Sequence, residues 1–221
     1  MIEAMKHSAD LSRLRSLAAM GLPEEAFVPA LLEAIHRIIP SDRNLFDWTE
    51  PGGRLVRYYF EGPIDHKINQ HYFDNFHNKL EAEVMPSFRE AVIGGAVIQS
   101  AELLDRPEFF RSALYNEIWR PQRLHTRMEA IVRDARDQPL GSLVLYRGPG
   151  ERKFTLQDEA LLARIVPYVV RGLGRPAEES SSDDYIAHRD RRAVLTLGFD
   201  GKLLQLSPDA LKLLLLSLIH I

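Results

Sequence analysis

Hydrophobic and polar positions are patterned most clearly between residues 124 and 173. Three alternating apolar residues, Met128, Ala130 and Val132, lead to a Gln-Pro turn, and a second apolar run covers residues 140–146. A Gly-Pro-Gly loop then precedes a long segment whose apolar residues recur at helical spacing. This order predicts two paired strands followed by one long helix. Because a hairpin and one helix cannot cover both faces of a sheet, the upstream residues must supply further strands and helices.

The upstream pattern predicts those elements. Leucines at helical spacing, closed by Gly21, indicate a first helix, and Pro23 followed by two acidic residues is typical of the start of a second. Two aromatic-rich runs flank a Pro-Gly-Gly turn and predict a hairpin. The order favours an α+β fold, in which helices cover an antiparallel sheet of about five or six strands. The expected helices cover residues 10–20, 23–38, 64–84 and 103–119, and the expected upstream strands cover residues 44–49, 55–60 and 96–98.

The composition changes after Gly174, where prolines, serines and acidic residues are typical of a solvated linker. Beyond it, two short apolar runs around Asp200-Gly201 predict a second hairpin, followed by a leucine-rich helix. A hairpin and one helix are too few to fold alone, so we expect a truncated segment, and residues 217–221 continue no pattern. The expected divisions are a domain over 10–174, a linker over 175–190 and a partial segment over 191–221.

Composition limits the classes of function. Of the 221 residues, 45% are hydrophobic and 27% are charged, as in a globular protein, and the net charge of -3 gives no basic excess for a nucleic-acid surface. The absence of cysteine excludes disulfides, thiolate metal ligands and cysteine nucleophiles. We see no secretion signal, and no apolar run approaches the roughly 20 residues of a membrane-spanning helix. We therefore expect a cytoplasmic protein that does not contact a membrane.

The last part of the main domain resembles a GAF domain. The matching features are the strand PLGSLVLYR, the motif Phe154-x-x-x-Asp158-Glu159 and the closing helix, and the resemblance covers roughly residues 15–173. Residues 87–134 look like the sensory half of LuxR-type bacterial transcriptional regulators, and residues 193–216 look like a PAS-like connector. The resemblance implies a GAF-like sensory domain and an incomplete PAS-like hairpin plus helix. It also implies DNA binding only through a C-terminal helix-turn-helix domain that this chain lacks.

The sequence departs from two branches of the GAF family. GAF domains that bind cyclic nucleotides carry an Asn-Lys pair just before the Phe-x-x-x-Asp-Glu motif, where this chain has Tyr146-Arg147. Covalent bilin attachment and the GAF-fold reductases of free methionine sulfoxide depend on cysteines, and this chain has none. The resemblance therefore favours a signal-sensing domain, without catalytic residues and without a cofactor, that binds an unknown small molecule.

A pocket between the sheet and its covering helices is the expected ligand site. Aromatic walls with a few polar groups suit a small organic ligand, although a packed core explains the same residues. Three histidines, His66, His71 and His77, lack the spacing of three or four that would place metal ligands on one helical face, so no metal site is expected. The expected pocket residues are Phe46, Trp48, Tyr58, Phe60, Tyr72, Phe76 and Trp119.

The closing helix is the expected route for a signal. Thr155 and Asp158 form a capping box at its start, and Pro167 interrupts its backbone hydrogen bonds. Because this helix both covers the sheet and leads to the linker, we expect it to transmit ligand binding, and we expect homodimerisation through the first or closing helix. Two alternatives stay open: a GAF-fold dimerisation scaffold without ligand, and the input domain of a histidine kinase.

Overall fold

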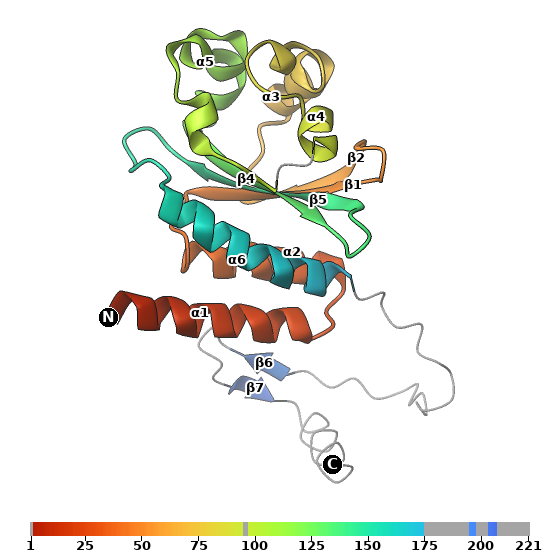
Figure 1. The fold of residues 1–221 in the computed structure, drawn as a ribbon, viewed down its shortest axis with the longest axis vertical. Helices are drawn as coiled ribbons and strands as arrows, with labels where there is room; N and C mark the ends of the chain where they lie inside the picture. Colours follow the sequence, from red (N-terminus) through yellow and green to blue (C-terminus); the bar gives the residue numbers. More distant parts are fainter. Residues whose placement is uncertain (1, 95–96, 175–194, 198–202, 207–221) are drawn as a thin grey trace. The chain divides into compact units, whose positions relative to one another are not determined.

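The computed structural model describes residues 2–94, 97–174, 195–197 and 203–206 (Figure 1). The chain divides into two compact units, residues 1–177 and 178–221. Of the second unit, the structure describes two strands, β6 (Leu195–Leu197) and β7 (Leu203–Leu206), which pair antiparallel as the sequence predicts. The expected linker, the turn at Asp200-Gly201 and the leucine-rich helix lie outside the described residues.

The first unit is built on a five-stranded antiparallel sheet, which confirms the predicted fold class. The strand order is β2-β1-β5-β4-β3, so the two sequence hairpins lie side by side and β5 is the central strand. Every described neighbouring pair in this sheet is antiparallel. The strands are β1 (Arg43–Thr49), β2 (Leu55–Phe60), β3 (Ile98–Gln99), β4 (Thr126–Arg133) and β5 (Pro139–Arg147).

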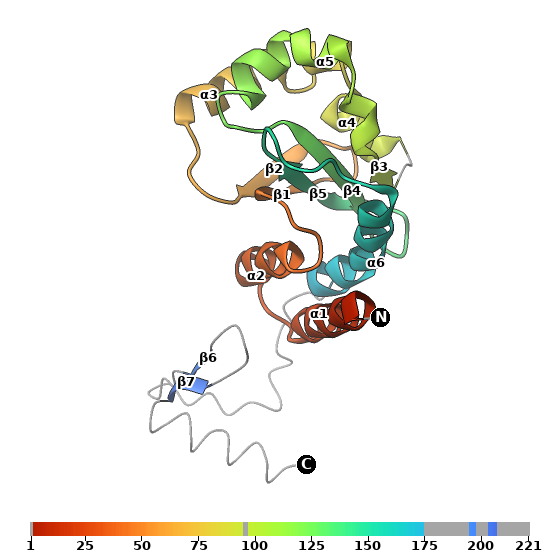
Figure 2. The same ribbon diagram turned by 90° about the vertical axis from the view of Figure 1, so that its left-hand side faces the viewer.

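Two helices, α2 (Glu24–His36) and α6 (Leu156–Leu173), cover one face of the sheet, and α1 (Ile2–Ala19) packs on their far side (Figure 2). Apolar residues at helical spacing on α2 and α6 meet alternating residues of the strands, and together they form the larger hydrophobic core. Gly172 allows α6 to approach α2 closely, because a Cβ atom there would lie 2.0 Å from Cζ of Phe27. None of the helices within the described residues has the length and apolarity needed to cross a membrane.

Short helices cover the opposite face, and here two predicted elements are wrong. The sequence predicts continuous helices over 64–84 and 103–119, but the structure breaks each into short segments. Asn78, at φ 55°, turns the chain in the first, and Ser112 is extended in the second. The segments are α3 (His66–His71), the π-helix η1 (Tyr72–Phe76), the 3-10 helix η2 (Leu80–Glu83), α4 (Phe88–Ile93), the 3-10 helix η3 (Ala101–Leu104), α5 (Pro107–Arg111) and the π-helix η4 (Leu114–Trp119).

Candidate ligand-binding site

A cavity of about 120 Å³ lies between the sheet and the short helices. Strands β1, β2, β4 and β5 form its floor, and α3, η1, η2 and η4 contribute to its wall. Figure 2 shows how these short helices lie across the sheet from α2 and α6. The volume accommodates a ring-sized organic group, since an engineered cavity of about 150 Å³ binds benzene.

Strand register decides which side chains face this cavity. Residues directly opposite each other in an antiparallel pair project from the same face of the sheet. Leu45 lies opposite Phe60, and Asp47 lies opposite Tyr58. All four residues line the cavity, and so does Leu55, which lies opposite Thr49 beyond a shift in register.

Phe46 and Trp48, expected in the pocket, lie on the other face of the sheet, and that part of the prediction is wrong. Phe46 is fully buried in the core formed with α2 and α6, and Trp48 packs against the same core. Their rings meet edge to face with centroids 4.9 Å apart. Successive residues of a strand point to opposite faces, so a strand that turns Asp47 into the cavity must turn both neighbours away.

The remaining five expected pocket residues lie on the cavity side of the sheet. Tyr58, Phe60, Tyr72 and Trp119 line the cavity itself. Phe76 is 2% exposed and packs in the apolar cluster beside the cavity without lining it. Whether these side chains contact a ligand stays a prediction.

Two π-helical segments supply much of the aromatic wall. Tyr72 and Phe73 come from η1, and Leu114, Ile118 and Trp119 come from η4. A π turn accommodates one more residue than an α turn, and such turns are frequent at functional sites. Sequence periodicity gave no sign of either segment, because apolar residues three and four apart predict an ordinary α-helix.

Three ionisable residues form the polar part of the floor: Asp47 on β1 and Glu129 on β4 are buried, and the side chain of Arg127 on β4 is 12% exposed. Nη2 of Arg127 lies 2.9 Å from Oε2 of Glu129, and the hydroxyl of Ser142 donates to Oδ2 of Asp47 at 3.3 Å. Burial, together with the nearby carboxylate of Glu129, raises the pKa of Asp47 to about 8. Asp47 is therefore mostly protonated at neutral pH.

The sequence prediction missed these three polar residues. The available signal was alternation: Arg127 and Glu129 alternate with Met128 and Ala130, which face the helical core. In an antiparallel sheet such alternation ordinarily indicates a solvent-facing side. Here the short helices cover that side, so the charged residues become the floor of a cavity.

Glu81 stabilises the wall above the floor. Glu81 is 1% exposed, and its Oε2 accepts a hydrogen bond from Tyr72 Oη at 2.8 Å. Its other oxygen accepts the backbone amides of Asn78 and Phe88, at 2.7 and 3.0 Å. Burial and the neighbouring Glu81 carboxylate raise the pKa of Tyr72. Glu81 thus joins η1, η2 and the start of α4 into one unit.

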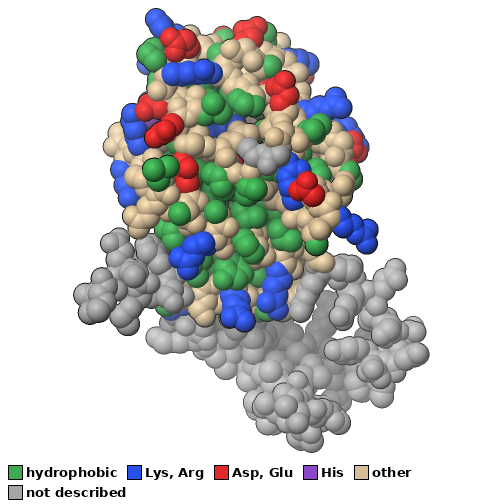
Figure 3. Space-filling view, viewed as in Figure 1, with side chains coloured by type: hydrophobic (Ala, Val, Ile, Leu, Met, Phe, Trp, Pro, Cys, Tyr) green, Lys and Arg blue, Asp and Glu red, His purple; other side chains and the backbone are tan. Residues whose placement is uncertain are grey.

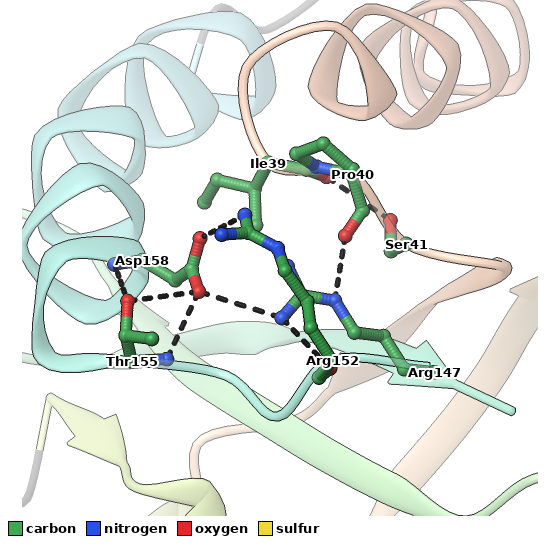
Figure 4. A network of polar contacts seen from close by, with 7 residues as sticks. All are labelled: Ile39, Pro40, Ser41, Arg147, Arg152, Thr155 and Asp158. Carbon is green, nitrogen blue, oxygen red and sulfur yellow. Dashed lines mark hydrogen bonds and ion pairs between the residues drawn. The ribbon is translucent and has the colours of Figure 1, made fainter. Parts of the chain in front are cut away.

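A second polar group, which we call the Arg147–Asp158 clamp, lies where β5 ends and α6 begins (Figure 4). It comprises Arg147, Arg152, Thr155 and Asp158. The predicted capping box is confirmed, since Thr155 Oγ1 accepts the amide of Asp158 at 3.3 Å and Asp158 Oδ2 accepts the amide of Thr155 at 2.9 Å. Arg147 donates to Asp158 at 3.4 Å and to the carbonyl of Pro40 at 2.8 Å. The clamp thereby ties α6 to β5 and to the loop after α2.

The clamp gives a structural reason for the Phe-x-x-x-Asp-Glu motif. The guanidinium of Arg147 lies 3.9 Å from the ring centroid of Phe154, and both residues are buried. Arg152 adds an outer contact to Asp158 at 3.1 Å. Pro167 lies within α6 and is exposed, while the helix continues to Leu173. A role of Thr155, Asp158 and Pro167 in signal transmission stays a prediction.

Two of the three histidines considered as metal ligands have other contacts in the structure. His71 contacts Glu117 at 2.7 Å, and His77 lines the cavity, where burial lowers its pKa. In the part of the chain that the structure describes, no group of three or more histidines and carboxylates is arranged to hold a metal ion.

Comparison with known proteins finds solved structures with a similar fold. No protein-family model and no curated protein sequence matches the chain. SdiA from Escherichia coli has a similar structure, with a TM-score of 0.52 and 16% identity over 76% of this chain and 69% of that chain. The N-acylhomoserine lactone dependent LuxR-family transcription factor CepR2 from Burkholderia cenocepacia gives a TM-score of 0.51 and 14% identity over 77% of this chain and 98% of that chain.

A third solved structure is similar to the same extent. Reduced fRMsr from Staphylococcus aureus gives a TM-score of 0.51 and 13% identity over 76% of this chain and 94% of that chain. At these identities the likeness shows a shared fold. The chain therefore has a GAF-like fold, a five-stranded antiparallel sheet covered by helices, which it shares with the matched parts of SdiA, CepR2 and fRMsr.

Proposed function

We propose that this chain is the ligand-sensing domain of a LuxR-type transcriptional regulator and that the cavity holds the small molecule it senses. The observation that carries the proposal is the cavity of about 120 Å³, with an aromatic wall and a buried polar floor. A dimerisation scaffold would need no such space, because closely packed side chains stabilise a fold better than a cavity does. The fold shared with SdiA and CepR2 agrees with a sensory role.

A binding role also agrees with the chemistry of the floor. Of the three ionisable groups there, Arg127 is paired with Glu129, and Asp47 receives a hydrogen bond from Ser142. The sequence has no cysteine, the residue on which GAF-fold reductases depend. The arrangement presents polar groups for recognition, and we assign no catalytic residue.

The experiment that tests the proposal is a thermal-shift screen of the protein against a library of small metabolites. A ligand that binds only the native state stabilises it, by about 2.7 kcal/mol at a hundredfold excess over its Kd, and therefore raises the melting temperature. Val144 is 1% exposed and projects from the centre of β5 into the cavity. Val144→Phe fills the space, so we expect it to abolish the shift given by every hit.

The matched control is Leu143→Phe, which enlarges the adjacent side chain on the opposite face, in the helical core. That variant is expected to lower stability through overpacking and still to bind every hit. A screen without hits, or hits that bind the Val144→Phe variant unchanged, would refute the sensing role and favour the scaffold.

We further propose that α6 carries the signal and takes part in a homodimer. The exposed positions of α6 include Leu156, Ala160, Ala163 and Pro167, and Figure 3 shows hydrophobic side chains gathered over this helix. Such an apolar face is typical of a surface that pairs with another chain. Ala163→Glu is expected to shift the protein from dimer to monomer in sedimentation velocity, whereas Arg164→Glu at the neighbouring exposed position serves as control.

A further inference from the structure

We propose that the cavity selects a ligand with a protonated amine, which lies between Asp47 and Glu129 while the apolar part of the ligand contacts the aromatic wall. The inference rests on the proposed function, namely that the cavity binds a small ligand. It adds the chemical class of that ligand.

The first argument is an excess of carboxyl groups. The described residues that line the cavity include three carboxyl side chains, Asp47, Glu81 and Glu129, and one guanidinium, Arg127. Their fully ionised sum is -3 + 1 = -2, and with Asp47 protonated at neutral pH the sum is -2 + 1 = -1. His77 adds no fixed charge, because burial lowers its pKa. A ligand that brings a positive charge therefore compensates the floor, and a ligand that brings a negative charge adds to the imbalance.

The second argument is that the single guanidinium is already paired. Arg127 lies 2.9 Å from Glu129 and donates to Gln99 at 3.4 Å. Its guanidinium also lies 6.0 Å from the centroid of the Trp119 ring. An anionic ligand would have to displace Glu129 and leave that carboxylate buried and unpaired, which is strongly unfavourable. This disfavours carboxylic acids and phosphate esters.

The third argument is that the carboxyl groups of Asp47 and Glu129 can accept further hydrogen bonds, whereas both oxygens of Glu81 already accept them. Both oxygens of Glu81 accept hydrogen bonds from Tyr72 or from backbone amides. Oε2 of Glu129 is buried and has no hydrogen bond of good geometry despite its closeness to Arg127. Asp47 receives only the long bond of 3.3 Å from Ser142. An ammonium group, with three donors, satisfies both carboxylates.

Register places the two carboxyl groups on either side of the central strand. Asp47 on β1 lies opposite Ser142, and Glu129 on β4 lies opposite Val144. The β5 residues between them are therefore one hydroxyl and one short apolar side chain, both facing the cavity side. These small residues leave space over β5 for a head group that reaches Asp47 from one side and Glu129 from the other.

The wall suits the rest of such a ligand. Tyr72 and Phe73 from η1, Trp119 from η4 and Tyr58 from β2 line the same cavity. Aromatic faces attract a cation when it lies within about 6 Å of the ring centroid, and they pack well against an aryl or alkyl chain. An arylalkylamine therefore matches both the floor and the wall.

Protonation of Asp47 gives the proposal a pH signature. The groups that act on Asp47 are Glu129 and Glu81, which raise its pKa with burial, and Ser142 and Arg127, which lower it. Tyr146 faces it from β5 with a raised pKa of its own. Below pH 8 an ammonium ligand must displace the proton of Asp47, so its affinity is expected to rise about tenfold per pH unit from pH 6 and to level off above pH 8.

Isothermal titration calorimetry with three probes of matched size tests the inference: 2-phenylethylamine, 2-phenylethanol and phenylacetate. At pH 7.5 we expect the amine to bind at least about tenfold more tightly than the alcohol, and the acid to bind least. Asp47→Asn and Glu129→Gln are each expected to remove most of the preference for the amine over the alcohol. Asp10→Asn is the control, since Asp10 is a similarly buried carboxyl on α1, away from the cavity.

Equal affinity for the three probes would overturn the inference. So would tightest binding by the acid, and so would a preference for the amine that survives both cavity substitutions. Far-UV circular dichroism establishes that each variant is folded. In those outcomes the sensing role itself stands as long as the Val144→Phe variant abolishes binding of other hits. If no probe binds and the metabolite screen also yields no hit, the inference and the proposed function fail together.

Discussion

Removal of Asp158 from the Arg147–Asp158 clamp is expected to destabilise the fold far more than removal of an ordinary surface carboxylate. Asp158 is 3% exposed, and its two oxygens accept from Thr155, Arg147 and Arg152. Asp158→Ala leaves the guanidinium of Arg147, which is 2% exposed, without its counter-charge. The same substitution removes half of the capping box at the start of α6.

The two losses set the magnitude. Breaking a buried ion pair by removing one partner costs about 3–5 kcal/mol, because the other charge stays buried. Loss of a helix cap costs about 1 kcal/mol. The two contributions share the same carboxylate and do not simply add, so we expect about 3–5 kcal/mol for Asp158→Ala and about 1 kcal/mol for Thr155→Ala. Arg152→Ala removes only a solvent-exposed partner and is expected to cost less than about 1 kcal/mol.

Urea unfolding followed by tryptophan fluorescence gives these free energies from the change in midpoint at constant slope. A double substitution, Arg147→Met with Asp158→Leu, distinguishes an unpaired charge from lost packing, since replacing both ions by apolar groups is expected to recover much of the stability. The reasoning is refuted if Asp158→Ala costs no more than Arg152→Ala, or if the double substitution is as unstable as the sum of its parts.

Two further predictions concern contacts outside the cavity. Gly172→Ala places a methyl group 2.0 Å from the Phe27 ring, so we expect it to destabilise the fold by about 1–3 kcal/mol, measured by urea unfolding. Gly150→Ala is the control: a Cβ there meets no atom within 4 Å, and the φ of 87° means that it reports backbone strain alone. The hydrogen bond from His36 to Glu61, at 2.8 Å, raises the pKa of His36 above 6.5, so its contribution is complete below that pH and is lost as the pH rises through the folded-state value. The stability lost in Glu61→Gln should accordingly be larger at pH 5.5 than at pH 8.5, and an equal loss at both would contradict this assignment.

The sheet and the long helix could be predicted because local signals and tertiary packing agree there. The capping box fixes the start of α6, and alternation on β4 and β5 continues into buried positions on one face. The breaks within the predicted helices over 64–84 and 103–119 could not be predicted. Their apolar spacing is helical throughout. In the first of them the buried carboxylate of Glu81 accepts the amides of Asn78 and Phe88 and thereby stabilises the turn, a contact that hydrophobic periodicity does not reveal.

The candidate site was predictable in part for a related reason. The sequence predicted four cavity-lining residues correctly, because large aromatic residues dominate any covered surface, whether it is a core or a pocket wall. These are Tyr58, Phe60, Tyr72 and Trp119. Alternation shows which residues of a strand share a face, but only the register with β5 shows which face the cavity occupies, and so Phe46 and Trp48 were misplaced. Asp47 and Glu129 were missed because a charged residue on a strand predicts solvent unless another element covers it.

The central strand connects the cavity to the clamp, and this gives the proposed signal a physical route. Val144 and Tyr146 face the cavity, Leu145 between them packs in the core with α6, and Arg147 at the end of the same strand binds Asp158 at the start of α6. A ligand can shift the position of α6 only if it binds one arrangement of these residues more tightly than another. A head group between Asp47 and Glu129 lies over β5 itself, where a change in strand position reaches Arg147 within a few residues. Hydrogen exchange should therefore slow in the first turn of α6 when ligand binds, and Arg147→Met should remove that effect while ligand affinity at the cavity persists.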